Sequence, residues 1–151
     1  MEKLAEIKAT YDWLLSLYDA EVEQMVRDND IAGIDRAEAR RDVFERGFFV
    51  LLFAQFEKAV TETFEDASRA RGASPDWGRR RGWDAVSALG KRIPFEAKLA
   101  MVMDRQSPSF GKIIATYGTR NHCAHGGTTN PVGSIMALEA DLYRWQGELR
   151  R

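Results

Sequence analysis

Residues 47–56 read GFFVLLFAQF, and this apolar run decides the expected fold. It has about half of the ~20 residues that a membrane-spanning helix needs, and charged residues flank it on both sides. Phe64 still lies on the helical stripe that the phenylalanines of the run begin. A helix that is apolar almost all round belongs in the middle of a bundle or at a subunit interface. We therefore predict a buried helix, from about residue 34 or 35 to about 71, and no membrane span.

Helical periodicity continues on both sides of this run. Residues 2–28 carry apolar side chains at spacings of three and four, which place them on one face of a helix. That stripe comprises Leu4, Ile7, Tyr11, Leu14, Tyr18, Val22 and Met25. Asp28-Asn29-Asp30 is expected to end this first helix. The same spacing predicts a last helix over residues 135–149.

The middle of the chain predicts shorter elements. Gly72, Pro75, Gly78 and Gly82 indicate a loop after the long helix. Short helices are expected over residues 84–89 and 94–104, and a longer one, capped by Ser109, leads into the segment TRNHCAHGG. No segment shows the alternation of a strand.

These elements predict an all-α fold. The simplest arrangement is an up-and-down bundle of four main helices plus one or two short helices. A chain of 151 residues fits one domain, so we expect a single domain over residues 1–151.

Charge and composition exclude several classes of protein. Lys and Arg number 22 against 23 Asp and Glu, so the net charge is −1 and any nucleic-acid role depends on a local patch. One cysteine excludes an intrachain disulfide framework and Cys-rich zinc modules. The first residues mix charges and lack the regions of a secretory signal, and the lone thiol suits a reducing compartment, so we expect a cytoplasmic protein.

Both histidines fall inside one segment, Arg120-Asn121-His122-Cys123-Ala124-His125. On a helix, Asn121 and His125 share a face, whereas Arg120 lies about 140° away around the axis. Gly126-Gly127 is expected to end the helix just after His125. No acidic or Cys cluster nearby completes a coordination sphere, so we expect no metal and no cofactor.

This segment resembles the signature of the HEPN superfamily, in which Arg and a polar residue precede a His by a few variable positions. The segment FAQFEKAV at residues 53–60 is similar to the second helix of HEPN proteins of the RiboL-PSP-associated type. The resemblance implies a helical bundle that forms a homodimer and is a metal-independent endoribonuclease, a toxin or phage-defence effector with an RNA substrate and an antitoxin or other defence protein as partner. Arg120 would contact the scissile phosphate, His125 would move protons, and Asn121 would position His125 or the phosphate.

Several interpretations stay open. The alternative function is a catalytically inactive HEPN module that binds RNA or a partner protein. His122 either assists catalysis or faces solvent, and Glu57 is either an acidic neighbour of Arg120 or a buried polar residue that needs a partner. A basic segment either contacts the RNA backbone or is simply solvated, and its members are Arg69, Arg71, Arg79, Arg80 and Arg81. Another HEPN branch has a Tyr two residues after the His; Gly127 stands there, which disfavours its regulatory chemistry.

Overall fold

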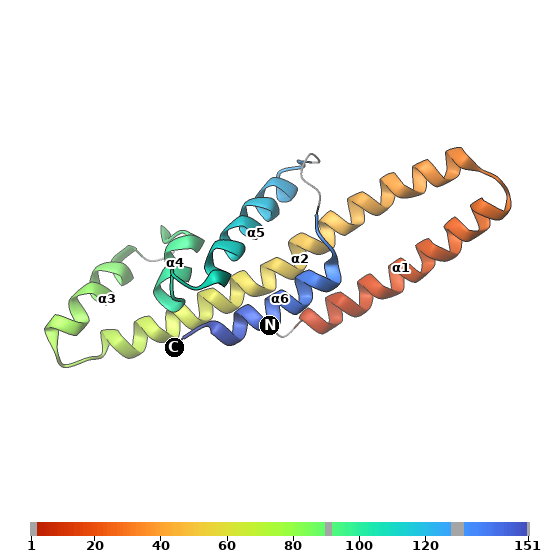
Figure 1. The fold of residues 1–151 in the computed structure, drawn as a ribbon. Helices are drawn as coiled ribbons and strands as arrows, with labels where there is room; N and C mark the ends of the chain where they lie inside the picture. Colours follow the sequence, from red (N-terminus) through yellow and green to blue (C-terminus); the bar gives the residue numbers. More distant parts are fainter. Residues whose placement is uncertain (1–2, 90–91, 128–131, 151) are drawn as a thin grey trace. The chain divides into compact units, whose positions relative to one another are not determined.

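The predicted all-α class is confirmed by a computed structural model that describes residues 3–89, 92–127 and 132–150. Within these ranges there is no strand, and no helix is both long and apolar enough to cross a membrane. Figure 1 labels the helices, which are α1 (Leu4–Arg27), α2 (Ile31–Gly72), α3 (Trp77–Leu89), α4 (Phe95–Val102), α5 (Pro108–Ala124) and α6 (Ile135–Glu148).

The chain divides into two compact units. The first comprises residues 1–55 and 117–141, and the second comprises residues 56–116 and 142–151. Helices α2, α5 and α6 each contribute residues to both units. The single domain over residues 1–151 stays a prediction.

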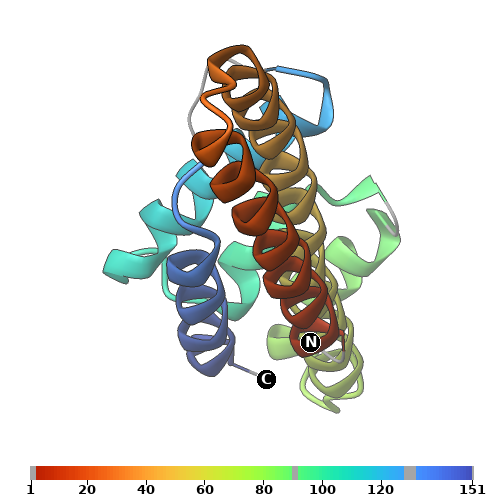
Figure 2. The same cartoon turned by 90° about the vertical axis from the view of Figure 1, so that its right-hand side faces the viewer.

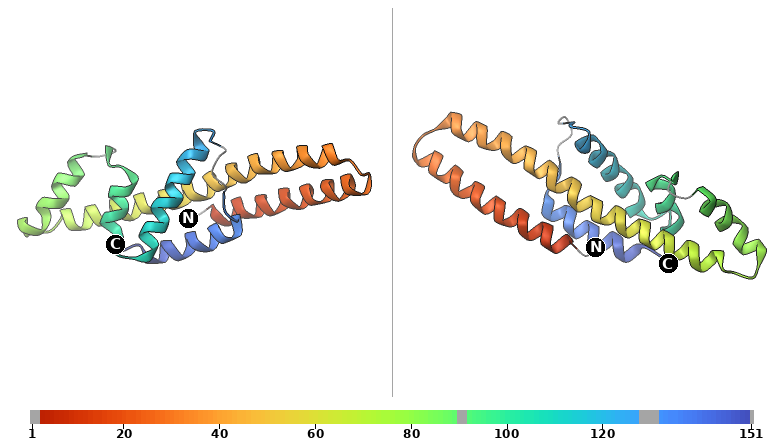
Figure 3. Two further views of the ribbon diagram at one scale, coloured as in Figure 1. Left: turned by 45° about the horizontal axis from the view of Figure 1, so that its top comes forward. Right: turned by 180° about the vertical axis from the view of Figure 1, so that it is seen from behind.

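In the first unit, α1 and the first part of α2 form an antiparallel hairpin (Figures 1, 2 and 3). The connection is the predicted Asp28-Asn29-Asp30 break, where Asn29 adopts a positive φ of 55°. The Asp30 carboxylate accepts the Gly33 N–H at 2.8 Å and so caps α2. This cap explains why α2 begins at Ile31, earlier than the predicted residue 34 or 35.

The predicted apolar stripe of α1 faces inward. Leu4 and Tyr11 are buried, and the other members of the stripe are half-buried. The Tyr11 ring packs edge-on against Phe48 at a centroid distance of 5.4 Å, and its hydroxyl donates to Glu45 at 3.2 Å. Burial, followed by the neighbouring Glu45 carboxylate, raises the pKa of Tyr11.

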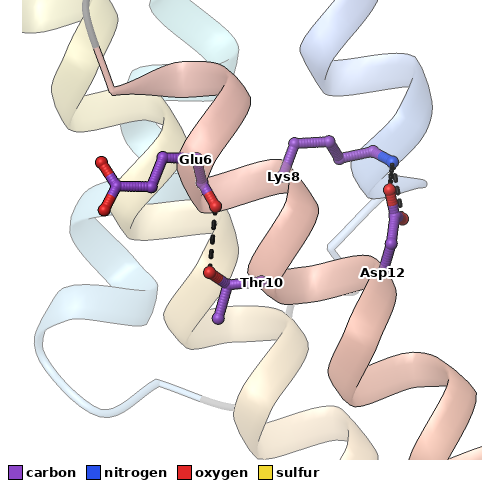
Figure 4. Close-up of polar contacts among 4 residues, drawn as sticks. All are labelled: Glu6, Lys8, Thr10 and Asp12. Atoms are coloured by element: carbon purple, nitrogen blue, oxygen red, sulfur yellow. Dashed lines mark hydrogen bonds and ion pairs between the residues drawn. The ribbon is translucent and has the colours of Figure 1, made fainter.

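The polar side chains of α1 contact one another along the helix, whereas the apolar stripe faces inward (Figure 4). Lys8 forms an ion pair with Asp12 at 2.6 Å, and the Thr10 hydroxyl donates to the Glu6 carbonyl at 2.9 Å. Both contacts span four residues, the spacing at which helical side chains become neighbours.

The run at residues 47–56 is buried on one side only. Phe49, Leu52 and Phe53 of the first unit are at most 5% exposed, whereas Leu51 is 51% exposed and Gly47 lies at the surface. The predicted burial is therefore confirmed for one face of α2 and is wrong for the opposite face.

The second unit packs around aromatic side chains. Phe56 lies against Trp145 at a centroid distance of 5.8 Å and against Phe95 at 6.4 Å. Trp145 is 1% exposed, and Leu99 and Leu142 are fully buried. These contacts join residues of α2, α4 and α6 in one core.

Two local predictions in the second unit are wrong. Residues 77–83 are the first half of α3 and not loop, because the Asp76 carboxylate accepts the Gly78 N–H at 2.8 Å and caps the helix, and Trp83 is buried. Helix α5 is capped by Ser107, whose hydroxyl accepts the Ser109 N–H at 3.2 Å. The predicted cap, Ser109, is instead buried and donates to Glu148 at 2.7 Å.

Replacing Trp145 by Ala is expected to lower the free energy of unfolding by about 3–5 kcal/mol, because it leaves a large cavity beside Phe56. The matched control is Trp13→Ala, since Trp13 is 60% exposed, and its change should stay within about 0.5 kcal/mol. Urea unfolding of the two variants measures the difference. Equal losses would contradict the packing described for the second unit.

Candidate functional site at the end of α5

The predicted end of α5 at Gly126-Gly127 is confirmed, and its geometry is that of a Schellman motif. The Gly126 N–H donates to the Cys123 carbonyl at 3.0 Å, and the Gly127 N–H donates to the His122 carbonyl at 2.9 Å. Gly126 has a φ of +80°, which glycine adopts without strain. His125 is the first residue beyond the helix, and its N–H still donates to the Asn121 carbonyl at 3.1 Å.

The side chains of this segment differ in exposure. Arg120 and Asn121 are half-buried and joined, because Arg120 Nη1 donates to Asn121 Oδ1 at 3.0 Å. His125 is exposed, and its imidazole has no hydrogen bond or ion pair within the described ranges of the chain. The end of α5 therefore carries the Arg120 guanidinium, which Asn121 holds, and the accessible imidazole of His125.

His122 lies differently from His125. It is half-buried, and its ring packs so closely on Gly127 that a Cβ at that position would collide with the ring. Gly127 is thus required for the close approach of the imidazole, and the ring covers the turn that follows the helix.

Arg46 of α2 is a residue of this region that sequence reasoning missed. Its Nη1 donates to the Gly127 carbonyl at 3.3 Å and lies 3.8 Å from Cys123 Sγ. Its Nε donates to Asp42 at 2.7 Å, and its side chain is only 11% exposed. The Asp42–Arg46 spacing of four residues, just before the apolar run, is a sequence signal that could have indicated a paired cation at this position.

The ion pair shifts the titration of both partners. The hydrogen bond from Arg46 holds the pKa of Asp42 below its ordinary value, and the same bond raises the pKa of Arg46. Arg46 therefore stays charged while it holds the carbonyl of the turn after His125.

The remaining predicted residues belong to the second unit. Glu57 is half-buried there, and its role beside Arg120 stays a prediction. Three of the five arginines of the basic segment pair with aspartates, in Arg69–Asp66 at 3.2 Å, Arg79–Asp76 at 3.5 Å and Arg80–Asp84 at 3.1 Å.

The other two arginines of the basic segment cover tryptophan rings. Arg71 lies 5.0 Å from the Trp83 centroid, and Arg81 lies 5.3 Å from that of Trp77. All five cations thus have local protein partners, although RNA contact by this segment stays a prediction. Over the described ranges, no three His, Cys, Asp or Glu side chains gather in a group that fits a metal ion.

Gly126→Ala should destabilise the protein by about 1–2 kcal/mol, because a Cβ is strained at a φ of +80°. Gly118→Ala, on the exposed surface of α5, is the control and should stabilise by roughly 0.5–1 kcal/mol, since nothing lies within 4 Å of the added methyl. Thermal and urea unfolding of both variants checks the opposite signs. A neutral Gly126→Ala would argue against the left-handed cap.

The Asp42–Arg46 pair predicts a pH dependence. A carboxyl whose pKa is lowered in the folded state stabilises the protein above its unfolded pKa of about 4, and that stabilisation disappears as the pH falls through the lower folded value. The stability difference between the parent and Asp42→Asn should thus be constant from about pH 5 to 8 and shrink below pH 4. In an Arg46→Met background, the same substitution should show no such decline. A difference that persists unchanged at low pH would contradict the assignment.

Comparisons of the chain with protein-family models, with curated proteins and with solved structures gave no match. The resemblance to HEPN proteins therefore depends on the Arg120–His125 segment, on the segment at residues 53–60 and on the helical class of the chain.

Proposed function

We propose that this chain is a metal-independent endoribonuclease of the HEPN type. The observation that carries the proposal is the end of α5, where Asn121 holds the Arg120 guanidinium and the His125 imidazole is exposed on a fixed turn. A cation for a phosphate and a group that transfers protons near neutral pH are what cleavage of RNA at its own 2′-OH requires.

The roles of the residues follow from this chemistry. His125 takes the proton of the 2′-OH or gives one to the departing 5′-oxygen. Arg120 donates to the oxygens of the phosphorane, because its planar guanidinium fits a phosphate. Asn121 keeps that guanidinium in place through the 3.0 Å hydrogen bond. The products carry 2′,3′-cyclic phosphate and 5′-hydroxyl ends.

One imidazole cannot be acid and base at the same time, so the proposal includes a homodimer. Two copies of the Arg120–His125 segment, one from each subunit, would line one cleft and supply both groups. The biological setting that fits such an activity is a cytoplasmic toxin or phage-defence effector, with an antitoxin or another defence protein as its regulator.

His125→Ala is expected to lower RNA cleavage by about 10²- to 10⁴-fold, the usual loss of a general acid or base. Arg120→Lys should also lower the rate strongly, because the ammonium cannot replace the planar fork. Lys112→Ala, an exposed position on the same helix, is the control and should cleave like the parent. The assay uses a mixed RNA pool with EDTA present, and the chemical nature of the product ends is determined.

Three outcomes contradict the nuclease proposal. If all variants cleave equally, the activity does not belong to this site. Cleavage that strictly needs Mg²⁺ would exclude the proposed chemistry. If the folded parent binds RNA or a protein partner but cleaves nothing, the chain is the alternative, a catalytically inactive HEPN module.

A further inference from the structure

A cavity of about 690 Å³ lies in the second unit, lined by residues of α2, α3 and α4 and by Ile93. None of its lining residues belongs to the Arg120–His125 segment. Its volume lies in the range of ligand pockets, about 300–1,000 Å³. Phe64 and Ile93 form an apolar wall and are themselves 5% and 7% exposed.

Lys98 is the feature of this cavity that points to a ligand. Its side chain is half-buried on α4 and donates to the Thr61 hydroxyl on α2 at 3.3 Å. That hydroxyl is its one polar contact within the described ranges, so no carboxylate neutralises the ammonium there. An ammonium carries three donors, and a partly desolvated cation is most stable beside an anion.

The other polar groups of the cavity fit an anion as well. Ser68 and Ser87 share a hydrogen bond of 2.7 Å, and one of the two hydroxyls keeps a proton to donate. Among the described residues that line the cavity, Arg69 is a second cation and Glu65, which is exposed, is the one carboxylate. Arg69 is exposed and forms an ion pair with Asp66 at 3.2 Å, so the half-buried cation of the cavity is Lys98.

We propose that this cavity is a binding site for a small organic anion. The oxyanion head, a carboxylate or a phosphate, accepts hydrogen bonds from Lys98, and an apolar or aromatic body packs on Phe64 and Ile93, with the serine hydroxyls as further donors elsewhere in the cavity. This site is independent of the proposed nuclease activity, because its residues and those of the Arg120–His125 segment do not overlap.

Gly72 offers a way to add bulk to the lining of the cavity without a collision at its Cβ. It lines the cavity at the end of α2, and a Cβ built there meets nothing within 4 Å. A leucine at this position would project a side chain into open space, and leucine is also a better helix former than glycine. Gly111 is a matched control, since it is also helical with open space around its Cβ but does not line the cavity.

The test is isothermal titration calorimetry of the full chain with three probes: phenyl phosphate, 3-phenylpropionate and inorganic phosphate. We expect saturable binding of at least one of the two aromatic anions, which also shows which head group is preferred, and markedly weaker binding of inorganic phosphate. Lys98→Met should lower the affinity for the aromatic anion by roughly tenfold to a hundredfold, which is the effect of losing a hydrogen bond to a charged group. Gly72→Leu should also weaken binding, because it adds a side chain to the lining of the cavity, whereas Lys112→Met, Gly111→Leu and His125→Ala should bind like the parent.

The proposal is overturned if neither aromatic anion binds the parent. It is equally overturned if Lys98→Met, folded by circular dichroism, binds like the parent, or if inorganic phosphate binds as tightly as the aromatic anions. His125→Ala should lose RNA cleavage and keep anion binding. Failure of the nuclease proposal and failure of this binding site are therefore distinguishable.

Discussion

The burial of aromatic and aliphatic side chains along α2 is the constraint on which the rest of the structure depends. Phe53 is fully enclosed in the first unit and Phe56 in the second, so this one helix supplies core residues to both. Each buried side chain of this size contributes about 1.5–3 kcal/mol relative to exposure. The polar contacts described above are smaller in effect, and they orient parts that this packing already holds together.

The region around His125 shows how such orientation works. Gly126 turns the chain out of α5, the His122 ring covers Gly127, and Arg46 reaches from α2 to the carbonyl of that same turn. The contacts are individually modest, but they act on consecutive residues. The segment that carries the HEPN-like signature is therefore fixed by groups outside the signature as well as by those within it.

The sequence predicted periodic elements and the end of α5 well, and the starts of helices poorly. The α1 stripe and the Gly126-Gly127 terminator follow from spacing and from glycine's conformational freedom, which are local properties. The start of α3 did not follow, because Gly78 and Gly82 indicate a loop unless the Asp76 cap and the burial of Trp83 are known. Arg46 was missed for a related reason: its contacts with Cys123 and Gly127 span 77 and 81 positions, a distance over which spacing within one helix carries no information.

The helix cap at Gly126 also determines how His125 can move. The His125 N–H donates a hydrogen bond to the Asn121 carbonyl, and Gly126, the next residue, has a left-handed conformation. These two constraints fix the position of the His125 Cα. The exposed ring then has only two torsions, χ1 and χ2, and a small set of staggered positions. The two ring nitrogens can therefore occupy only a short arc of positions around that Cα. A group that exchanges a proton with His125 has to lie within hydrogen-bond distance of one of these positions.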